Sequence, residues 1–241
     1  MKDVFINYVN DFDLDNEKIK LKYDHSLRVM DLCIKYAKLL NFNEKDIKLA
    51  GLIGLFHDIG RFKQIKECDT FSDLNSFDHA MLSSKILFED GLIKEIWDDE
   101  SDYELIKFAI ENHNKISLEK TNDERILKHA KLIRDADKVD IIYLTGNLGI
   151  SDLTTVDIPF EEKALDEYFD HKLVSWEYEN SKNYWILVYF SYVFDINYEF
   201  SLKEISKYYD DLYDKIKDNK VFEDVYNELK RYINERLLKW N

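Results

Sequence analysis

The chain has 241 residues, of which 45% are hydrophobic, 34% charged and 15% aromatic. This composition supports a packed core and excludes a largely disordered chain. With one proline and six glycines, the chain lacks the turn residues that a β-sandwich or β-barrel needs about every 8–12 positions. We therefore predict an all-α fold.

The charge is strongly acidic, because 49 Asp and Glu residues face 34 Lys and Arg residues, giving a net charge of −15. Such a field repels nucleic acid polymers, so we expect none as a partner. The N-terminal residues do not resemble a signal peptide, and the longest apolar stretch, Trp185 to Phe194, is too short to span a bilayer. We expect a soluble, cytoplasmic protein with no membrane partner.

In chain order, the first predicted helix covers residues 17–40, where Leu27, Met30, Ile34 and Ala37 recur at helical spacing. Cys33 lies on the same apolar face, as expected for a small buried side chain.

Asn43 is a candidate N-cap for a second helix, whose apolar run Ile47 to Phe56 is expected to end at Gly60 as the C′ residue. Residues 61–75 are polar and irregular and predict a long loop, in which Thr70 to Asp73 could form a movable lid. Further helices are predicted at 77–90, 101–114, 122–146, 160–171, 181–195, 201–218 and 220–238.

Histidines and certain aspartates form the chemical pattern of the sequence. Imidazole and carboxylate groups are common ligands of divalent ions, and separate helices of a bundle are rigid places to mount them. The candidates fall on predicted helices or at helix ends, and they are His25, His57, Asp58, His79, His113 and Asp137.

The doublet His57-Asp58 ends an otherwise apolar helix, where polar side chains are costly unless they are paired or bind a metal. Neighbouring helical positions point about 100° apart, so both could address one ion only where the backbone turns. We expect Gly60 to provide that turn. By contrast, His129 and His171 fit no position in the pattern and are interpreted as structural or solvated.

The sequence LFHDIGR, with DHSLRV upstream and RDADKVD downstream, resembles the HD-domain superfamily of metal-dependent phosphohydrolases, whose pattern is His…His-Asp…Asp. The resemblance covers about residues 20–145. A subset of this superfamily carries two additional histidines and two metals, and here FDHAMLSS and AIENHNK place His79 and His113 in those positions.

The resemblance implies one divalent ion held by His25, His57, Asp58 and Asp137, and a second held by Asp58, His79 and His113. Asp58 would then bridge two ions, and Fe, Mn, Zn, Ni, Co and Mg are not distinguished. Alternatively, with a single ion present, His79 and His113 could cap helices or bind phosphate directly.

Two adjacent ions can clamp a phosphoryl group and generate hydroxide near neutral pH, which makes Asp58 catalytic. The resemblance places a basic residue at Arg61 beside the metal, where it would bind phosphate and steady the developing charge. Helical spacing adds Arg28, one turn after His25, as a second phosphate-binding cation. The expected enzyme is a phosphohydrolase (EC 3.1) acting on a small phosphate ester such as a nucleotide, as a phosphomonoesterase or a phosphodiesterase.

Two alternatives remain open. HD-related di-iron oxygenases use the same six-ligand arrangement, and a non-catalytic nucleotide-binding protein could keep a vestigial site.

For the domain organisation, we expect one all-α unit over 1–241, with an HD-type metal-binding core at 20–146 and a helical extension at 147–241 packed on it. The aromatic residues at 184–200 are expected to serve packing rather than to stack on a nucleobase.

Overall fold

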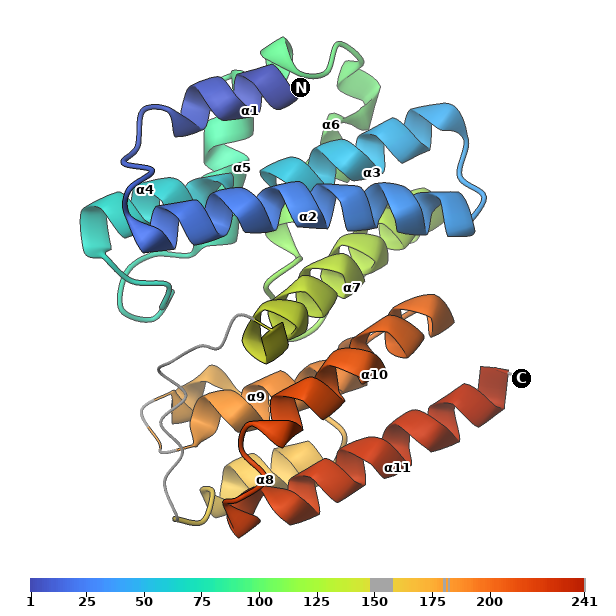
Figure 1. The fold of residues 1–241 in the computed structure, drawn as a ribbon. Helices are drawn as coiled ribbons and strands as arrows, with labels where there is room; N and C mark the ends of the chain where they lie inside the picture. Colours follow the sequence, from blue (N-terminus) through green and yellow to red (C-terminus); the bar gives the residue numbers. More distant parts are fainter. Residues whose placement is uncertain (148–157, 180, 182, 241) are drawn as a thin grey trace. The chain divides into compact units, whose positions relative to one another are not determined.

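The computed structural model describes residues 1–147, 158–179, 181 and 183–240, and within them it contains helices and no strand (Figure 1). The all-α prediction is therefore confirmed. The chain divides into two compact units, Met1–Asp137 and Lys138–Asn241. The packing of the C-terminal helices on the core as a single unit stays a prediction.

The first unit is built from helices that surround an apolar core. Its helices are α1 (Lys2–Val9), α2 (Glu17–Leu39), α3 (Glu44–Phe56), α4 (Ile59–Cys68), α5 (His79–Phe88), the short 3₁₀ helices η1 (Leu92–Glu95) and η2 (Glu100–Asp102), α6 (Tyr103–Glu111) and the first half of α7 (Glu124–Asn147).

The starts of α2 and α3 show why these segments fold locally as the sequence predicts. Asn43 accepts a hydrogen bond from the backbone N–H of Asp46, which confirms it as the N-cap of α3. Asn16 caps α2 in the same way, on the N–H groups of Lys18 and Ile19. Cys33 of α2 is fully buried, as predicted.

The prediction for the segment after the His57-Asp58 doublet is wrong in two respects. Residues 61–68, predicted as the start of a loop over 61–75, belong to helix α4 (Ile59–Cys68), and Gly60 lies inside that helix instead of ending the previous one. Ile59, Phe62 and Ile65 are buried at a spacing of three residues and form a short apolar stripe. Polar and charged residues between them make the segment look like a loop in the sequence.

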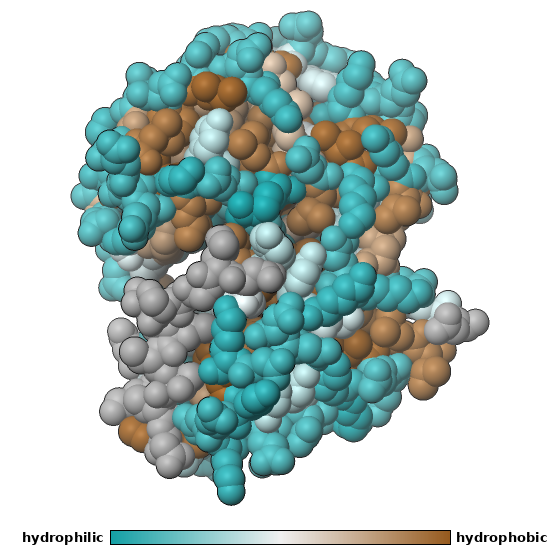
Figure 2. Space-filling model, in the orientation of Figure 1, coloured by the Kyte–Doolittle hydropathy of each residue, from teal (hydrophilic) through white to brown (hydrophobic). Residues whose placement is uncertain are grey.

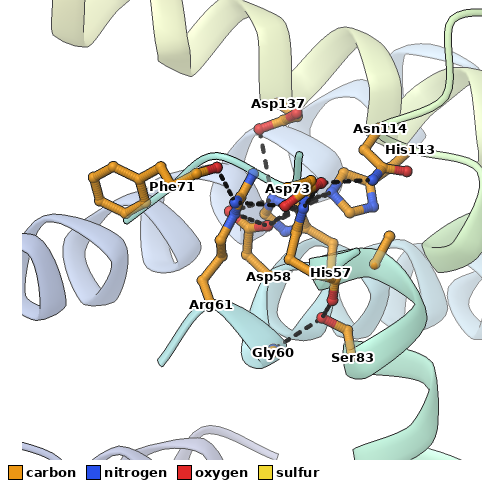
Figure 3. Close-up of polar contacts among 12 residues, drawn as sticks. His57, Asp58, Gly60, Arg61, Phe71, Asp73, Ser83, His113, Asn114 and Asp137 are labelled. Carbon is orange, nitrogen blue, oxygen red and sulfur yellow. Dashed lines mark hydrogen bonds and ion pairs between the residues drawn. The ribbon is translucent and has the colours of Figure 1, made fainter. Parts of the chain in front are cut away.

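Gly60 has a different role, because it allows α4 to approach α5 closely. A Cβ atom at Gly60 would lie 2.5 Å from the carbonyl oxygen of His79 and 2.8 Å from the backbone nitrogen of Ser83. The Gly60 N–H donates a hydrogen bond to Ser83 Oγ (Figure 3). Lack of a side chain, rather than a left-handed backbone, is what this position needs.

Helix α1 is a further element that the sequence reading did not predict. Its residues Phe5 and Val9 are fully buried. The Phe5 ring makes edge contacts with Phe56 and Phe62, at ring-centroid distances of 5.7 and 5.9 Å. Helix α1 thus covers the apolar side of the α3–α4 pair.

The second unit contains the second half of α7 and the C-terminal helices. These are α8 (Glu162–Phe169), η3 (Trp176–Tyr178), α9 (Tyr184–Ser191), η4 (Tyr192–Asp195), α10 (Glu199–Asp214), η5 (Lys220–Phe222) and α11 (Glu223–Trp240). Within the aromatic segment, Tyr184 and Phe190 are buried, and Phe190 contacts the Tyr209 ring at 6.0 Å. These residues therefore serve packing, as expected.

The surface is predominantly hydrophilic on the face that Figure 2 shows, with apolar residues visible between charged ones. None of the helices in the described ranges combines the length and the low charge that crossing a membrane requires.

Candidate metal centre

Five side chains of the first unit converge on the carboxylate of Asp58 and form two groups (Figure 3). On one side, Asp58 Oδ2 lies 3.5 Å from Nε2 of His25 and 3.5 Å from Nε2 of His57. Asp137 Oδ1 completes this group, 3.2 Å from His25 Nε2 and 3.5 Å from His57 Nε2. The two imidazole Nε2 atoms are 3.3 Å apart.

The second group faces the other oxygen of the same carboxylate. Asp58 Oδ1 lies 3.2 Å from His79 Nε2 and 3.5 Å from His113 Nε2, and these two nitrogens are 3.0 Å apart. The structure thus brings together all six predicted ligands, all buried in the first unit. Each oxygen of Asp58 faces its own pair of imidazoles, which is the arrangement a bridging carboxylate requires.

The local backbone explains how two neighbouring residues reach one centre. Helix α3 ends before His57, and Asp58 (φ −105°, ψ 15°) precedes the first residue of α4. The chain therefore turns at the doublet itself, as predicted, although Gly60 is not the cause. His25 and Asp137 come from the long helices α2 and α7, whereas His79 is the first residue of α5.

Hydrogen bonds on the outer nitrogens determine which imidazole atoms are free to bind a ligand. His57 Nδ1 lies 2.8 Å from the carbonyl oxygen of Gly54, and His113 Nδ1 lies 2.6 Å from that of Ile110. Because a carbonyl only accepts hydrogen bonds, we assign a proton to Nδ1 of each ring. The lone pairs of both Nε2 atoms then point into the centre.

His79 is oriented by a carboxylate instead of a carbonyl. Its Nδ1 donates to Asp73 Oδ2 at 2.6 Å, which leaves Nε2 to face Asp58 and His113. Asp73 comes from the segment between α4 and α5. The sequence placed it in a possible lid and did not predict its contact with His79. Asn114 Nδ2 also lies 3.3 Å from Asp73 Oδ2 (Figure 3).

The protonation states favour a cation at the centre. Burial, together with the nearby His57 and His79, lowers the pKa of His113 to about 4, against the opposing effect of Asp58, so this ring is neutral at pH 7. Burial alone would raise the pKa of Asp58, but the positive charge of Lys22 and the neighbouring imidazole rings outweigh it, and the pKa lies well below its ordinary value.

The pKa of Asp137 is also well below its ordinary value, because the close contacts of its carboxylate with the His25 and His57 rings outweigh the effect of burial. Two carboxylates and inward-facing imidazole lone pairs form a donor set suited to a divalent ion. Asp58 Oδ1 is, among the described residues, a buried oxygen without a hydrogen-bond donor in suitable geometry. The residues therefore fit the divalent ions that the motif implies.

Lys22 is a second site residue that sequence reasoning missed. Its Nζ lies 2.6 Å from Asp58 Oδ2, and its side chain is only 12% exposed. Lys22 precedes His25 by three residues on α2, so it lies on the same face one turn earlier. The spacing of three residues could have identified Lys22 from the sequence. Asp73 lies in a non-helical segment, where no periodic pattern marks it.

The two predicted phosphate-binding arginines differ in their placement. Arg61 Nη1 donates to the Gln64 side chain at 2.6 Å, the Phe71 carbonyl at 2.5 Å and Asp73 Oδ1 at 3.0 Å (Figure 3). Arg61 Nε lies 3.7 Å from Asp58 Oδ1. Arg28 is half-buried on α2, and its role in phosphate binding stays a prediction.

The remaining histidines are structural. His129 is buried against Asp46, with Nε2 3.4 Å from Oδ1, and its ring contacts Phe42 at 4.9 Å. His171 follows α8, and its Nε2 lies 2.7 Å from Glu228 Oε1. Neither side chain belongs to the groups around Asp58.

The segment between α4 and α5, which contains the possible lid, is hydrogen-bonded to α4 beside the site. The side-chain amide of Gln64 donates to Asp73 Oδ1, Ser76 Oγ and the Phe77 carbonyl at 2.8–3.0 Å. Gln64 itself is fully buried. These bonds connect the segment between α4 and α5 to the helix that follows the doublet.

Comparison with known proteins agrees with this geometry. Residues 23–142 match the family model of the HD domain, a stretch of 120 residues that contains all six predicted ligands and makes up half of the chain. The search of curated proteins found no match, and the search of solved structures found none either. The motif, the convergence of its ligands and the family match agree, and the chain belongs to the HD-domain family, within the superfamily of metal-dependent hydrolases.

Proposed function

We propose that this protein is a phosphohydrolase that uses two divalent ions to hydrolyse a small phosphate ester, with nucleotides as the first substrate class to test. One observation carries the proposal: the two oxygens of Asp58 face separate pairs of imidazole Nε2 atoms. A carboxylate in that position is suited to bridge two ions. An assay with both kinds of ester will determine whether the enzyme prefers phosphate monoesters or diesters.

In this proposal, one ion is held by His25, His57, Asp137 and Asp58 Oδ2. The second is held by His79, His113 and Asp58 Oδ1. When bound, the ions would supply an activated water and the positive charge that a phosphate needs in an acidic protein.

Arg61 contributes a hydrogen-bond donor beside this centre. Its Nη1 atom is held by acceptors of the protein, whereas its Nε is, among the described residues, a buried donor without an acceptor. A buried donor without a partner costs free energy, which a phosphate oxygen would recover. We assign Arg61 to bind phosphate and Lys22, beside Asp58, to add positive charge at the same place.

The test combines metal analysis with activity. The protein is purified anaerobically, its metals are measured, and hydrolysis of p-nitrophenyl phosphate, bis-p-nitrophenyl phosphate and nucleotides is assayed with Mn²⁺. We expect the wild type and the control H171A to hydrolyse at least one of these substrates, and H57A and D58A to be inactive. Undiminished hydrolysis by folded H57A and D58A would refute the proposal.

The same preparation tests the alternatives. Iron-dependent turnover with substrate-dependent oxygen uptake would identify a di-iron oxygenase, because hydrolysis with Mn²⁺ proceeds equally under argon. Tight nucleotide binding without turnover with any divalent metal would instead identify a non-catalytic nucleotide-binding protein.

A further inference from the structure

Asp73 joins two functional side chains through one carboxylate. Its Oδ2 accepts a hydrogen bond from His79 Nδ1 at 2.6 Å, and its Oδ1 accepts one from Arg61 Nη1 at 3.0 Å. We propose that Asp73 is a positioning residue that holds His79 ready for the second ion and directs Arg61 toward phosphate. This inference rests on the proposed function.

Asp73 controls which nitrogen of the His79 ring carries the proton. A carboxylate that accepts from Nδ1 fixes the tautomer and the orientation of an imidazole ligand and raises its basicity. Asp73 thereby keeps the Nε2 lone pair of His79 directed at the position it shares with His113 Nε2, 3.0 Å away. Without the carboxylate, nothing would keep the proton of the ring on Nδ1, and the tautomer with its proton on Nε2 has no Nε2 lone pair for an ion.

The two ion positions differ in how their ligands are supported. His57 and His113 donate from Nδ1 to backbone carbonyls three residues earlier, so the chain that carries each ring also holds it. His79 depends on a side chain from the segment between α4 and α5. The second ion position therefore depends on that segment through His79.

The second part concerns Arg61. The Asp73 carboxylate, the Gln64 side chain and the Phe71 carbonyl all accept from Arg61 Nη1, and they hold the guanidinium with Nε 3.7 Å from Asp58 Oδ1. Asp73 is in turn held by Gln64 Nε2 at 2.9 Å. Removal of Asp73 would leave Arg61 with one fewer fixed contact and a less defined direction for its Nε.

The test compares D73A and the isosteric D73N with a matched control, D78A. Asp78 also lies beside His79, but it caps α5 by accepting from the N–H groups of Ala80 and Met81. It also accepts from Asn114 Nδ2 at 3.0 Å, and within the described residues it has no hydrogen bond to the His79 ring or to Arg61. A general loosening of the α5 start would affect D78A as well, whereas loss of positioning would not. Circular dichroism verifies that each variant is folded.

Mn²⁺ binding is measured by calorimetry, and electron paramagnetic resonance distinguishes a coupled pair of ions from a single ion. We expect two ions in the wild type and in D78A. In D73A we expect an unchanged first ion and a second ion bound about 10- to 100-fold more weakly, with loss of the coupled signal. D73N retains one uncharged acceptor, so its second ion should weaken less.

Two measurements complete the test. Imidazole NMR of the metal-free protein should show His79 protonated on Nδ1 in the wild type and a mixture of tautomers in D73A. At saturating Mn²⁺, the inhibition constant of inorganic phosphate should rise in D73A and in R61K but not in D78A.

Wild-type affinity for both ions in folded D73A and D73N would overturn the inference while leaving the proposed function in place. Equal weakening in D73A and D78A would also overturn it, because the effect would then belong to the start of α5. A wild-type protein that binds no Mn²⁺, Fe²⁺ or Zn²⁺ would instead refute the proposed function itself.

Discussion

Fully buried cations are expensive, and Arg134 shows how this protein uses one. Its side chain is completely buried on α7, and Nη1 donates to the carbonyl oxygens of Asn112 and Lys115, both at 2.7 Å, and of His113 at 3.3 Å. These carbonyls belong to the segment that carries a predicted metal ligand. Arg134 therefore stabilises the fold and holds the backbone of His113 in place at once.

Replacement of Arg134 by Met is expected to lower the free energy of unfolding by about 3 kcal/mol, because buried carbonyls lose a charged donor. The measurement is urea denaturation at pH 7. Lys131→Met is the control, since Lys131 lies on the same helix and is partly exposed. A loss no larger than that of the control would show that Arg134 is dispensable.

His129 makes stability depend on pH away from the metal centre. Burial lowers its pKa to about 4 from an ordinary value of 6.5, although Asp46 acts in the opposite direction. As the pH falls below 6.5, the unfolded chain binds a proton that the folded protein does not bind until about pH 4. The contribution of His129 to stability is therefore complete above pH 6.5 and is lost as the pH falls.

When the pH is lowered from 7 to 5, the protonation of His129 in the unfolded chain should lower the free energy of unfolding by about 2 kcal/mol. Urea denaturation of the wild type and of H129Q is measured at pH 7 and at pH 5. The other titrating groups contribute equally to both proteins, so the difference between the two decreases in unfolding free energy belongs to His129. We expect a smaller decrease in H129Q. An NMR titration of His129 with a midpoint near 6.5 would contradict the expectation.

At the scale of elements, the close approach of α4 and α5 joins the doublet to His79. Gly60 of α4 would place an added Cβ against the backbone of His79 and Ser83, which cannot move as a flexible side chain can. The helix pair is therefore held at a distance that only glycine allows.

Replacement of Gly60 by Ala should lower the free energy of unfolding by about 1–3 kcal/mol, because the added methyl group overpacks this contact. It should also weaken metal binding through displacement of His79. Gly51→Ala is the control, since the atoms nearest to its Cβ, at 2.9–3.9 Å, belong to the side chains of Ile34 and Met30, which can move, and not to a backbone. Thermal denaturation and Mn²⁺ titration measure both effects, and equal behaviour of the two variants would contradict the prediction.

The elements also show what a sequence can and cannot predict. The sequence could predict the cluster of all six candidate ligands, because each lies in a local motif on a regular helix or at its end. Helix α4 was missed because its apolar residues Ile59, Phe62 and Ile65 alternate with charged ones over only ten residues.

The support of the site was harder to predict than its ligands. Asp73 and Arg134 act through contacts with residues 6 and 19–22 positions away in the chain. Such contacts depend on how segments pack. Asp73 lies outside any periodic pattern, and Arg134 lies on a predicted helix, where a charged residue gives no sign that it will be buried. Lys22 was within reach of sequence reasoning, since it lies one turn before His25 on the same helix.

At the scale of the whole molecule, the division into two units determines which helices metal binding should stabilise. All six predicted ligands lie in Met1–Asp137, whereas α10 and α11 belong to the second unit. The chain carries a net charge of −15, and divalent ions offset the charge of Asp58 and Asp137 at the centre. Metal binding should therefore add to the stability of the first unit.

Saturation with Mn²⁺ at 100 times its dissociation constant should raise the opening free energy of the first unit by about 2.7 kcal/mol for one site. Hydrogen–deuterium exchange measures this change as slower exchange of the protected amides in α2 and α3, up to about 100-fold where exchange requires unfolding of that unit. Amides in α10 and α11 should exchange at unchanged rates, because none of the ligands lies there. D58A is the control and should show no slowing. Equal slowing in α2 and α11 would contradict the prediction, since the binding energy would then stabilise both units as one cooperative structure.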